Sequence, residues 1–232
     1  MSVKVFGDSF SATHKYPYFN DHWSTIVGRT IGEEVINYGR IGATNQYILN
    51  SISKNIPNLS EDDYVFIQIS GQGRIPVIGV PHLSFFPDES YFLDVSNDKK
   101  HQLTKTERKI IMELYCRFFL KDGAITQGEI VNTIIELANF ISTKVKKVVL
   151  WNLTPLSGLT DIHYDQIKFQ NIEITHSDLW TESSCGGNKG WIDVMIENNV
   201  TFSEFDPHPH PIKGNKLIAK EFLSGIVKTS LI

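Results

Sequence analysis

The sequence predicts an α/β fold in which helices cover both faces of a mostly parallel sheet. Three apolar stretches each end in a glycine-containing turn, at Gly7, Gly39 and Gly71, and amphipathic helical patterns alternate with them. Short connections of this kind give right-handed crossovers, so the strands run parallel and the three turns meet at one edge of the sheet. Ligands usually bind at that edge, and we therefore expect the site there.

The individual elements follow from hydrophobic periodicity and from β-branched and aromatic content. Strands are predicted at residues 3–6, 35–38, 64–69 and 147–153. Helices are predicted at 22–32, 44–56, 104–120 and 126–143, and from about 213 near the C-terminus. In the helix at 126–143, the residues expected on the buried stripe are Ile130, Ile134, Leu137 and Phe140.

Two stretches break the alternation of strands and helices. Residues 75–103 are rich in proline and aromatic residues, and we interpret them as an inserted cap or lid, because they are too short to carry a core of their own. Residues 156–199 have an irregular pattern and are expected to form loops. The chain is therefore predicted to be a single domain over 1–232 with these two additions.

The composition is that of a globular protein and excludes several classes of partner. Hydrophobic residues make up 41%, charged residues 21%, and the net charge is −4 with no long basic block, so we expect no nucleic-acid or membrane partner. Cys116 and Cys185 lie far apart and are expected to be reduced, with a disulfide as the alternative. The first strand begins at once without a signal segment, which predicts a cytoplasmic protein and leaves release or association with a virion open.

Ser9 is the candidate nucleophile. It follows the first predicted strand in the turn Gly7-Asp8-Ser9-Phe10, where a serine is held clear of the sheet and its own N–H can face a developing oxyanion. Serine and aspartate are also favoured helix caps, so these residues alone leave a purely structural turn open.

A second polar cluster precedes the C-terminal helix. Asp206 and His208 supply a carboxylate and an imidazole, and the intervening prolines stiffen the loop. A serine hydrolase needs a base beside the serine and a group that orients the base. His208 and His210 also form a His-x-His pair of the kind that binds zinc, but no third ligand stands out, so we expect no metal and no other cofactor.

Taken in order, these blocks resemble the SGNH (GDSL-type) hydrolases. The resemblance is carried by Gly7-Asp8-Ser9-Phe10, by Gly42 after the second strand, by the glycine-rich turn after the third and by Asp-x-His-Pro before the last helix. It runs from residue 4 to about residue 219. It implies a three-layer, flavodoxin-like sandwich with a five-stranded sheet.

The resemblance also implies roles for individual residues. Ser9 would be the nucleophile, His208 the general base and Asp206 the carboxylate that orients the base. The oxyanion hole would comprise the N–H groups of Ser9 and Gly42 and a side-chain donor. The family uses an asparagine there, whereas this sequence has Gln72, which keeps the carboxamide but adds a methylene.

Three more residues are expected near the substrate. Asp8 and Asn45 lie in the first two turns, and His210 lies at the pocket mouth in the predicted arrangement, where it is also the alternative to His208 as the base. His208 is preferred because Asp206 stands two positions before it and can fix its tautomer.

Two functions of different classes fit the sequence. The first is an esterase that removes a small acyl group, such as an O-acetyl group, from a carbohydrate. Its partner would be a small-molecule ester or an acylated glycan, and four aromatic side chains could stack on a sugar or pack within loops: Phe86, Tyr91, Trp180 and Trp191. The second is a non-catalytic relative that binds a glycan or builds an assembly. The oligomeric state is left open.

Overall fold

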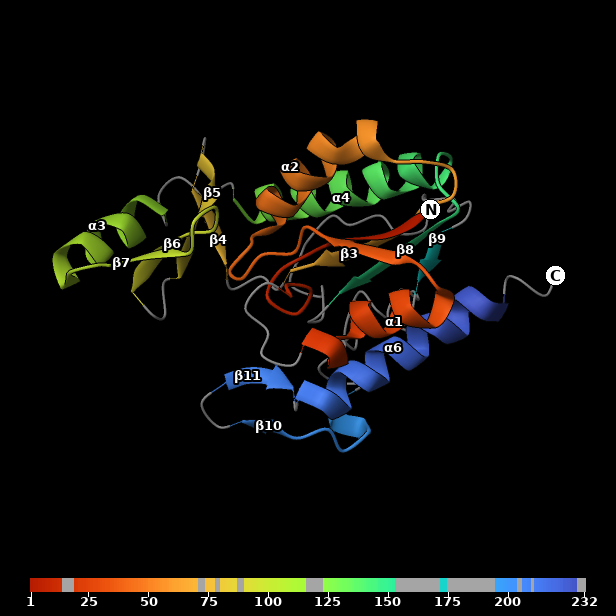
Figure 1. Cartoon of the computed structure of the whole chain (residues 1–232). Helices are drawn as coiled ribbons and strands as arrows, with labels where there is room; N and C mark the ends of the chain where they lie inside the picture. The colour runs from red at the N-terminus through yellow and green to blue at the C-terminus, as the bar shows by residue number, and fades with distance from the viewer. Residues whose placement is uncertain are drawn as a thin grey trace.

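A parallel sheet of five strands forms the centre of the molecule (Figure 1). The computed structural model describes residues 1–13, 19–70, 74–77, 80–86, 90–115, 123–152, 172–174, 195–203, 206–209 and 211–228. The sheet comprises β1 (Ser2–Phe6), β2 (Glu34–Asn37), β3 (Tyr64–Ile69), β8 (Lys147–Asn152) and β9 (Ile172–Ile174).

The topology of this sheet confirms the predicted fold class. The strands lie in the order β2-β1-β3-β8-β9, and each neighbouring pair is parallel. Counted along the chain, this is the order 2-1-3-4-5 of a flavodoxin-like, doubly wound sheet. Strand β9 lies inside residues 156–199, which were predicted to form loops. Its Ile172 pairs with Val148 of β8, so β9 is the fifth strand, at one edge of the sheet.

Helices cover both faces of the sheet and complete three layers. Helices α1 (Trp23–Ile31) and α6 (Pro211–Lys228) contact each other on one face, and α2 (Asn45–Asn55) and α4 (Gly123–Ser142) on the other (Figure 1). Short 3-10 helices precede α1 and follow α2, at Phe19–Asp21 and Ile56–Asn58. No helix in the described ranges is long and apolar enough to cross a membrane.

Large aromatic side chains fill the core between the sheet and the α1–α6 layer. The Trp23 ring lies 5.0 Å from Phe222 of α6, 5.4 Å from Phe66 of β3 and 5.8 Å from Trp151 of β8, measured between ring centroids. Aromatic side chains bury roughly 150–250 Å² each, so this cluster holds helices α1 and α6 firmly against the strands.

The buried face of α4 differs from the predicted stripe. Ile130 and Ile134 are buried as predicted, but Phe140 is 49% exposed. Two successive steps of three residues, from Ile134 to Leu137 and on to Phe140, turn Phe140 away from the sheet. Four further residues of α4 face the core: Val131, Ile135, Ala138 and Ile141. The exposed Phe140 ring instead lies under Lys144, whose Nζ atom is 4.9 Å from the ring centroid.

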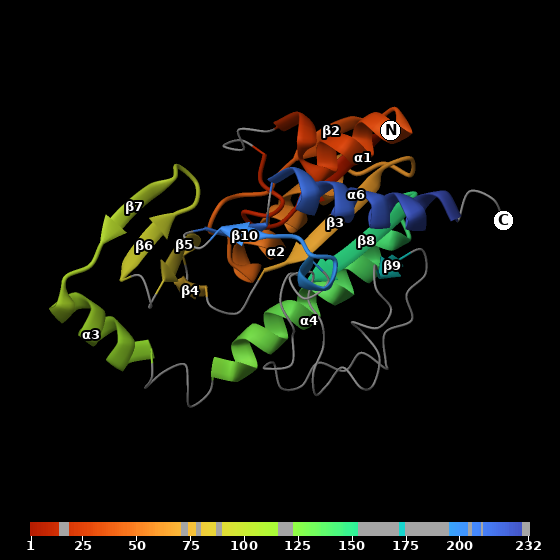
Figure 2. The same ribbon diagram turned by 90° about the horizontal axis from the view of Figure 1, so that it is seen from below.

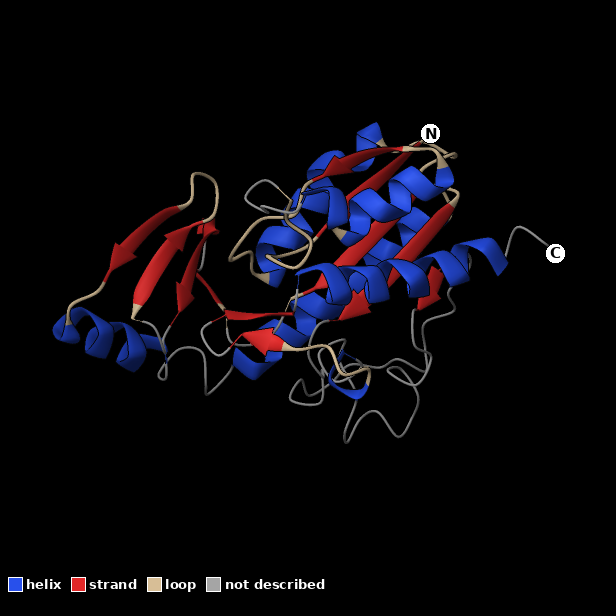
Figure 3. Cartoon of the chain, turned by 60° about the horizontal axis from the view of Figure 1, so that its bottom comes forward, coloured by secondary structure: helices blue, strands red, loops and turns tan. Residues whose placement is uncertain are grey.

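A second sheet stands beyond the carboxyl ends of the central strands (Figures 1 and 2). It is antiparallel and comprises β4 (Ile75–Val77), β5 (Val80–Phe86), β6 (Tyr91–Asp94) and β7 (Lys99–Gln102), followed by α3 (Lys105–Tyr115). These strands occupy the stretch interpreted as an insertion. Figure 3 shows them to one side of the parallel sheet, and β4 and β5 contact α2. Their role as a lid stays a prediction.

A two-stranded antiparallel sheet leads into the last helix. It comprises β10 (Phe202–Ser203) and β11 (Asp206–Pro209), and β11 contacts α6, which begins two residues after it (Figure 1). This brings the segment that holds the predicted acid–base pair to the same side of the molecule as the carboxyl ends of the central strands.

Candidate active site

Ser9 lies on a tight turn at the carboxyl end of β1. The carbonyl of Asp8 accepts hydrogen bonds from the N–H groups of Ser11 and Ala12, at 3.0 and 2.9 Å, and so closes the turn around Ser9. Gly7 is required where the turn begins, because a Cβ atom there would lie 2.4 Å from Ser11 Oγ. The turn leaves Ser9 partly exposed between the buried residues Asp8 and Phe10, as expected for a nucleophile that a substrate must reach.

The Asp8 carboxylate beneath this turn is fully buried and is satisfied by four donors. Its Oδ1 atom accepts from Gln68 Nε2 at 2.7 Å and from the Phe10 N–H at 3.0 Å. Its Oδ2 atom accepts from Ser70 Oγ at 2.8 Å and from Arg74 Nη1 at 2.7 Å. A charge in this position needs such partners, because an unpaired buried carboxylate is strongly destabilising.

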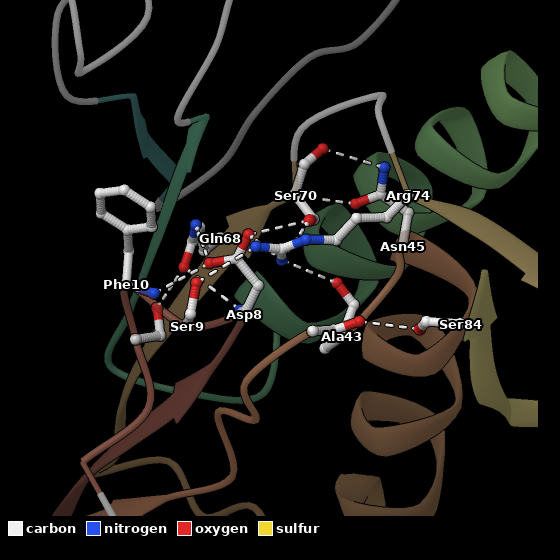
Figure 4. Close-up of polar contacts among 11 residues, drawn as sticks. Asp8, Ser9, Phe10, Ala43, Asn45, Gln68, Ser70, Arg74 and Ser84 are labelled. Carbon is white, nitrogen blue, oxygen red and sulfur yellow. Dashed lines mark hydrogen bonds and ion pairs between the residues drawn. The ribbon is translucent and has the colours of Figure 1, made fainter. Parts of the chain in front are cut away.

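Arg74 joins this buried carboxylate to the candidate nucleophile. Its Nη1 group donates to Asp8, to Ser70 Oγ at 3.1 Å and to the Ala43 carbonyl at 3.2 Å. Its Nη2 group donates to Ser9 Oγ at 3.2 Å (Figure 4). Sequence reasoning did not single out Arg74. The available signal was its position, as a cation at the end of the glycine turn after β3, on the same sheet edge as Ser9.

Gly42, whose N–H is predicted to belong to the oxyanion hole, lies in a turn that requires glycine. Its φ of 77° lies in the left-handed region, and an added Cβ atom would lie 2.1 Å from Leu93 Cδ2, so only glycine fits there. Ser84 Oγ donates to its carbonyl at 2.7 Å and fixes the peptide from outside. Within the part of the chain that the structure describes, neither the Ser9 nor the Gly42 N–H donates to a protein acceptor.

Asn45 and Asp8, both expected to contact substrate, support the site from within. The Asn45 side chain is buried, and its carboxamide bonds the backbone of Ser70 at both ends: Oδ1 accepts from the Ser70 N–H at 2.7 Å, and Nδ2 donates to the Ser70 carbonyl at 3.2 Å. These bonds fix the end of β3, where Ser70 meets Asp8. Both buried side chains therefore position their neighbours, and a contact of either with substrate stays a prediction.

His22 is a buried histidine beside the turn that sequence reasoning did not single out. Burial lowers its pKa to about 4, although its contact with the Phe10 carbonyl opposes this, so the ring is neutral at pH 7. Its Nδ1 atom accepts from the Ser24 N–H at 3.3 Å, and its Nε2 atom lies 3.2 Å from the Phe10 carbonyl oxygen. With both nitrogens engaged, His22 serves as a support of the Ser9 turn.

A chain of hydrogen bonds ties the start of α6 to this turn. Trp23 Nε1 donates to the Phe10 carbonyl at 2.9 Å, and the Trp23 N–H donates to Asn215 Oδ1 at 2.9 Å. Because β11 directly precedes α6, these bonds bring the backbone of residues 206–209 to the edge of the sheet that carries Ser9. The side chains of Asp206 and His208 lie outside what the structure describes.

Other predicted residues also fall outside the described ranges: Gln72, His210, Cys116, Cys185, Trp180 and Trp191. Of the four aromatic residues considered for sugar stacking, Phe86 and Tyr91 are described and stack on each other, with centroids 4.7 Å apart. The described ranges hold no group of three His, Cys, Asp or Glu side chains arranged to bind a metal ion.

Comparison with known proteins gives similarity at the level of solved structures. No protein-family model and no curated protein matches the chain. One similar structure is a member of the lipolytic protein G-D-S-L family from Veillonella parvula, at 15% identity and a TM-score of 0.48, with 97% of each chain covered. Another, described as lipolytic and of the same family, is from Desulfitobacterium hafniense, at 16% identity and a TM-score of 0.47, covering 95% of this chain and 97% of that one. The chain is thus similar, over nearly its whole length, to solved lipolytic proteins of the G-D-S-L family.

Proposed function

We propose that this protein is a serine esterase that hydrolyses a small ester through an acyl-enzyme. The observation that carries the proposal is the environment of Ser9: a partly exposed hydroxyl on a tight turn at the carboxyl end of β1, within 3.2 Å of a guanidinium group. A hydroxyl that only capped a helix would need neither this exposure nor a neighbouring cation.

In the proposed reaction, Ser9 Oγ attacks the carbonyl carbon of the ester. His208 takes the Ser9 proton and later gives it to the departing alcohol, while Asp206 holds the imidazole in the correct tautomer. Water then attacks the acyl-enzyme by the same route and releases the acid. The support for the acid–base pair is the sequence Asp-Pro-His before α6 and the position of β11 at the Ser9 edge.

The oxyanion formed at each step would meet the N–H groups of Ser9 and Gly42. Both lie in turns whose backbone is fixed by buried contacts, so their dipoles are oriented before the substrate arrives. Gln72 is proposed as a further side-chain donor, since it lies in the turn between Ser70 and Arg74, which both bond Asp8.

The acyl group is proposed to be small, such as acetyl. Leu93 Cδ2 and Phe86 Cζ lie 2.1 and 3.4 Å from the position of a Cβ atom at Gly42, so side chains crowd this side of the oxyanion turn. An O-acetyl group on a carbohydrate fits this restriction, with the sugar outside. His210 is proposed to line the mouth of the pocket, and an acylated glycan or a small ester is the proposed partner.

The central test is covalent labelling together with hydrolysis. Wild-type protein should hydrolyse p-nitrophenyl acetate and react with a fluorophosphonate at Ser9, detected by the mass of the adduct. Ser9→Ala should lose at least roughly 1,000-fold in kcat with an unchanged Tm. Ser53→Ala is the control, because Ser53 is exposed on α2 and its hydroxyl bonds only the Leu49 carbonyl of the same helix, so the labelling should stay intact.

Two outcomes would redirect the proposal. Absence of both hydrolysis and labelling in the wild type would favour the non-catalytic glycan-binding alternative, which the replacement of the family's asparagine by Gln72 motivates. Loss of turnover in His210→Asn but not in His208→Asn would move the base to His210 and remove the role of Asp206.

A further inference from the structure

We infer that Arg74 is a catalytic residue of this site, whose Nη2 group stabilises the oxyanion of the ester. The inference rests on the proposed function. It adds a residue to which the resemblance to the SGNH hydrolases assigns no role. Its starting point is the distance of 3.2 Å between Arg74 Nη2 and Ser9 Oγ, the atom that would attack the ester (Figure 4).

The guanidinium group is fixed before a substrate arrives. Its Nη1 group is held by Asp8 Oδ2, Ser70 Oγ and the Ala43 carbonyl, at 2.7, 3.1 and 3.2 Å. Asp8 and Ser70 are themselves held by Gln68 and Asn45 through buried hydrogen bonds. Donors fixed in this way cost no reorganisation when charge develops, which is the condition for strong oxyanion stabilisation.

The two amino groups of Arg74 divide two tasks between them. Nη1 serves the buried carboxylate, which has no exposed surface, whereas the Arg74 side chain as a whole keeps 19% of its surface exposed. Nη2 lies on the Ser9 side. Arginine can do both because its planar fork holds the two groups in a fixed relation, whereas the single ammonium of lysine cannot.

The chemistry of the attack places the oxyanion within reach of Nη2. When Ser9 Oγ bonds the carbonyl carbon, the π-electron pair moves to the carbonyl oxygen. This oxyanion and Oγ are then bonded to the same carbon atom, so a donor beside Oγ can also reach the oxyanion. The Ser9 proton leaves to the general base, and Arg74 keeps all its protons, because a guanidinium is not deprotonated in proteins. Its role is therefore to donate a charge-assisted hydrogen bond to the oxyanion. When the intermediate collapses, the oxyanion electron pair re-forms the carbonyl π bond, the C–O bond to the alcohol breaks, and the alcohol oxygen takes the proton from His208.

The alternative is that Arg74 is only the counter-ion of Asp8, and a double variant separates the two roles. In Asp8→Asn the buried charge is absent, so removing Arg74 from this background no longer leaves a carboxylate unpaired. We therefore compare Asp8→Asn with Asp8→Asn/Arg74→Gln, measuring Tm and the kcat and KM for p-nitrophenyl acetate. Arg74→Lys and Arg74→Gln in the natural background complete the set.

The expected result is a loss of turnover without a loss of fold. The double variant should have the Tm of Asp8→Asn but a kcat at least roughly 100-fold lower, with KM changed by less than about threefold, as for removal of one oxyanion donor. Arg74→Lys should recover only part of the loss. A kcat within threefold of Asp8→Asn would overturn the inference and leave Arg74 as a structural counter-ion.

A second substrate separates stabilisation of the oxyanion from recognition of an anionic substrate. If Arg74→Gln raised KM for p-nitrophenyl hemisuccinate and left the kcat for the neutral acetate unchanged, Arg74 would bind a substrate carboxylate and the inference would be wrong. Failure of the proposed function looks different: the wild type would show neither hydrolysis nor fluorophosphonate labelling, and both proposals would fall together.

Discussion

The two edges of the central sheet each hold a buried carboxylate paired with a cation, yet the two pairs are built differently. At the amino edge, Lys4 Nζ lies 2.5 Å from Asp63 Oδ2, and the two side chains are 6% and 3% exposed. At the carboxyl edge, Arg74 lies 2.7 Å from Asp8 Oδ2, with 19% and 0% exposed. We call the Lys4–Asp63 pair the closed pair, because both of its side chains are almost fully buried. In the Arg74–Asp8 pair, the Arg74 side chain is partly exposed.

The partners of each pair show the same difference. Lys4 Nζ also donates to the Asn58 carbonyl, and Asp63 also accepts from Ser2 Oγ and the Ser60 N–H, so every contact stabilises the fold. Arg74 instead extends to the hydroxyl of Ser9. A buried ion pair alone is therefore weak evidence for a site, and what distinguishes the carboxyl edge is a donor aimed at the hydroxyl of Ser9, the proposed nucleophile.

The largest expected effect is on stability, from breaking the closed pair. Lys4→Met leaves Asp63 buried without its cation and should lower the free energy of unfolding by about 3–5 kcal/mol, measured by urea denaturation. Turnover per folded molecule should not change. Lys4→Met/Asp63→Asn should recover most of the loss. A cost below about 1 kcal/mol for Lys4→Met would show that the closed pair is not held as the structure indicates.

The next effect is a pH dependence of stability that originates at the carboxyl edge. The pKa of His22, beside the Ser9 turn, is lowered from 6.5 to about 4, mainly by burial. Between pH 6.5 and 4, His22 is therefore protonated in the unfolded chain and neutral in the folded chain. The free energy of unfolding should fall by about 3 kcal/mol as the pH drops through this range. His22→Gln should flatten this slope. An equal slope in wild type and variant would assign it to another group.

The amino edge should respond in a lower window. Desolvation raises the pKa of Asp63, but hydrogen bonds from Lys4, the Ser60 N–H and Ser2 outweigh it and bring the pKa from 3.8 to about 2. Because the folded pKa is depressed, the stabilisation is present above about pH 4 and is lost as pH falls toward 2, amounting to about 2 kcal/mol. Acid titration of the unfolding free energy should show this step in wild type, and Lys4→Met/Asp63→Asn should lack it.

The smallest effect compares two matched serines. Ser2 Oγ donates to Asp63 and Ser70 Oγ to Asp8, both at 2.8 Å, and both residues are buried. Ser2→Ala and Ser70→Ala should each cost about 1–2 kcal/mol in unfolding free energy. Only Ser70→Ala should also lower kcat, by several-fold, because Ser70 Oγ holds Arg74 as well. Equal kcat values in the two variants would remove the functional distinction between the edges.

Local sequence signals were enough to predict the central strands and most helices. Strands β1, β3 and β8 are buried apolar runs, and α1 ends at Gly32 with a φ of 79°, as its glycine suggests. Strand β9 was missed because it has three residues at a sheet edge and depends on pairing with β8, which is distant in sequence. The antiparallel sheet was missed because prolines interrupt the alternation of its strands, and the interpretation of residues 75–103 as an insertion stays a prediction.

The candidate site was predictable in outline and not in its contacts. The glycines indicated the turns that carry Ser9 and Gly42, because a positive φ or a close approach of the backbone favours glycine, whereas the roles of these two residues stay predictions. Nothing local to residue 74 indicates that its side chain folds back over β1 to reach Asp8. Likewise, only the folded structure shows that the Asn45 side chain bonds the backbone of Ser70 and so fixes the end of β3.

The small antiparallel sheet contacts the turn at Gly42 through Ser84 and Leu93, whereas all four residues of β7 are exposed. For protein engineering, this divides the insertion into an inner part that must be kept and an outer part that can be exchanged. Grafting a different outer strand while retaining Ser84 and Leu93 would alter the surface that the molecule presents around the candidate site and leave the peptide of Gly42 in place. Families of variants with the same central sheet and many different outer surfaces are therefore accessible from this single scaffold.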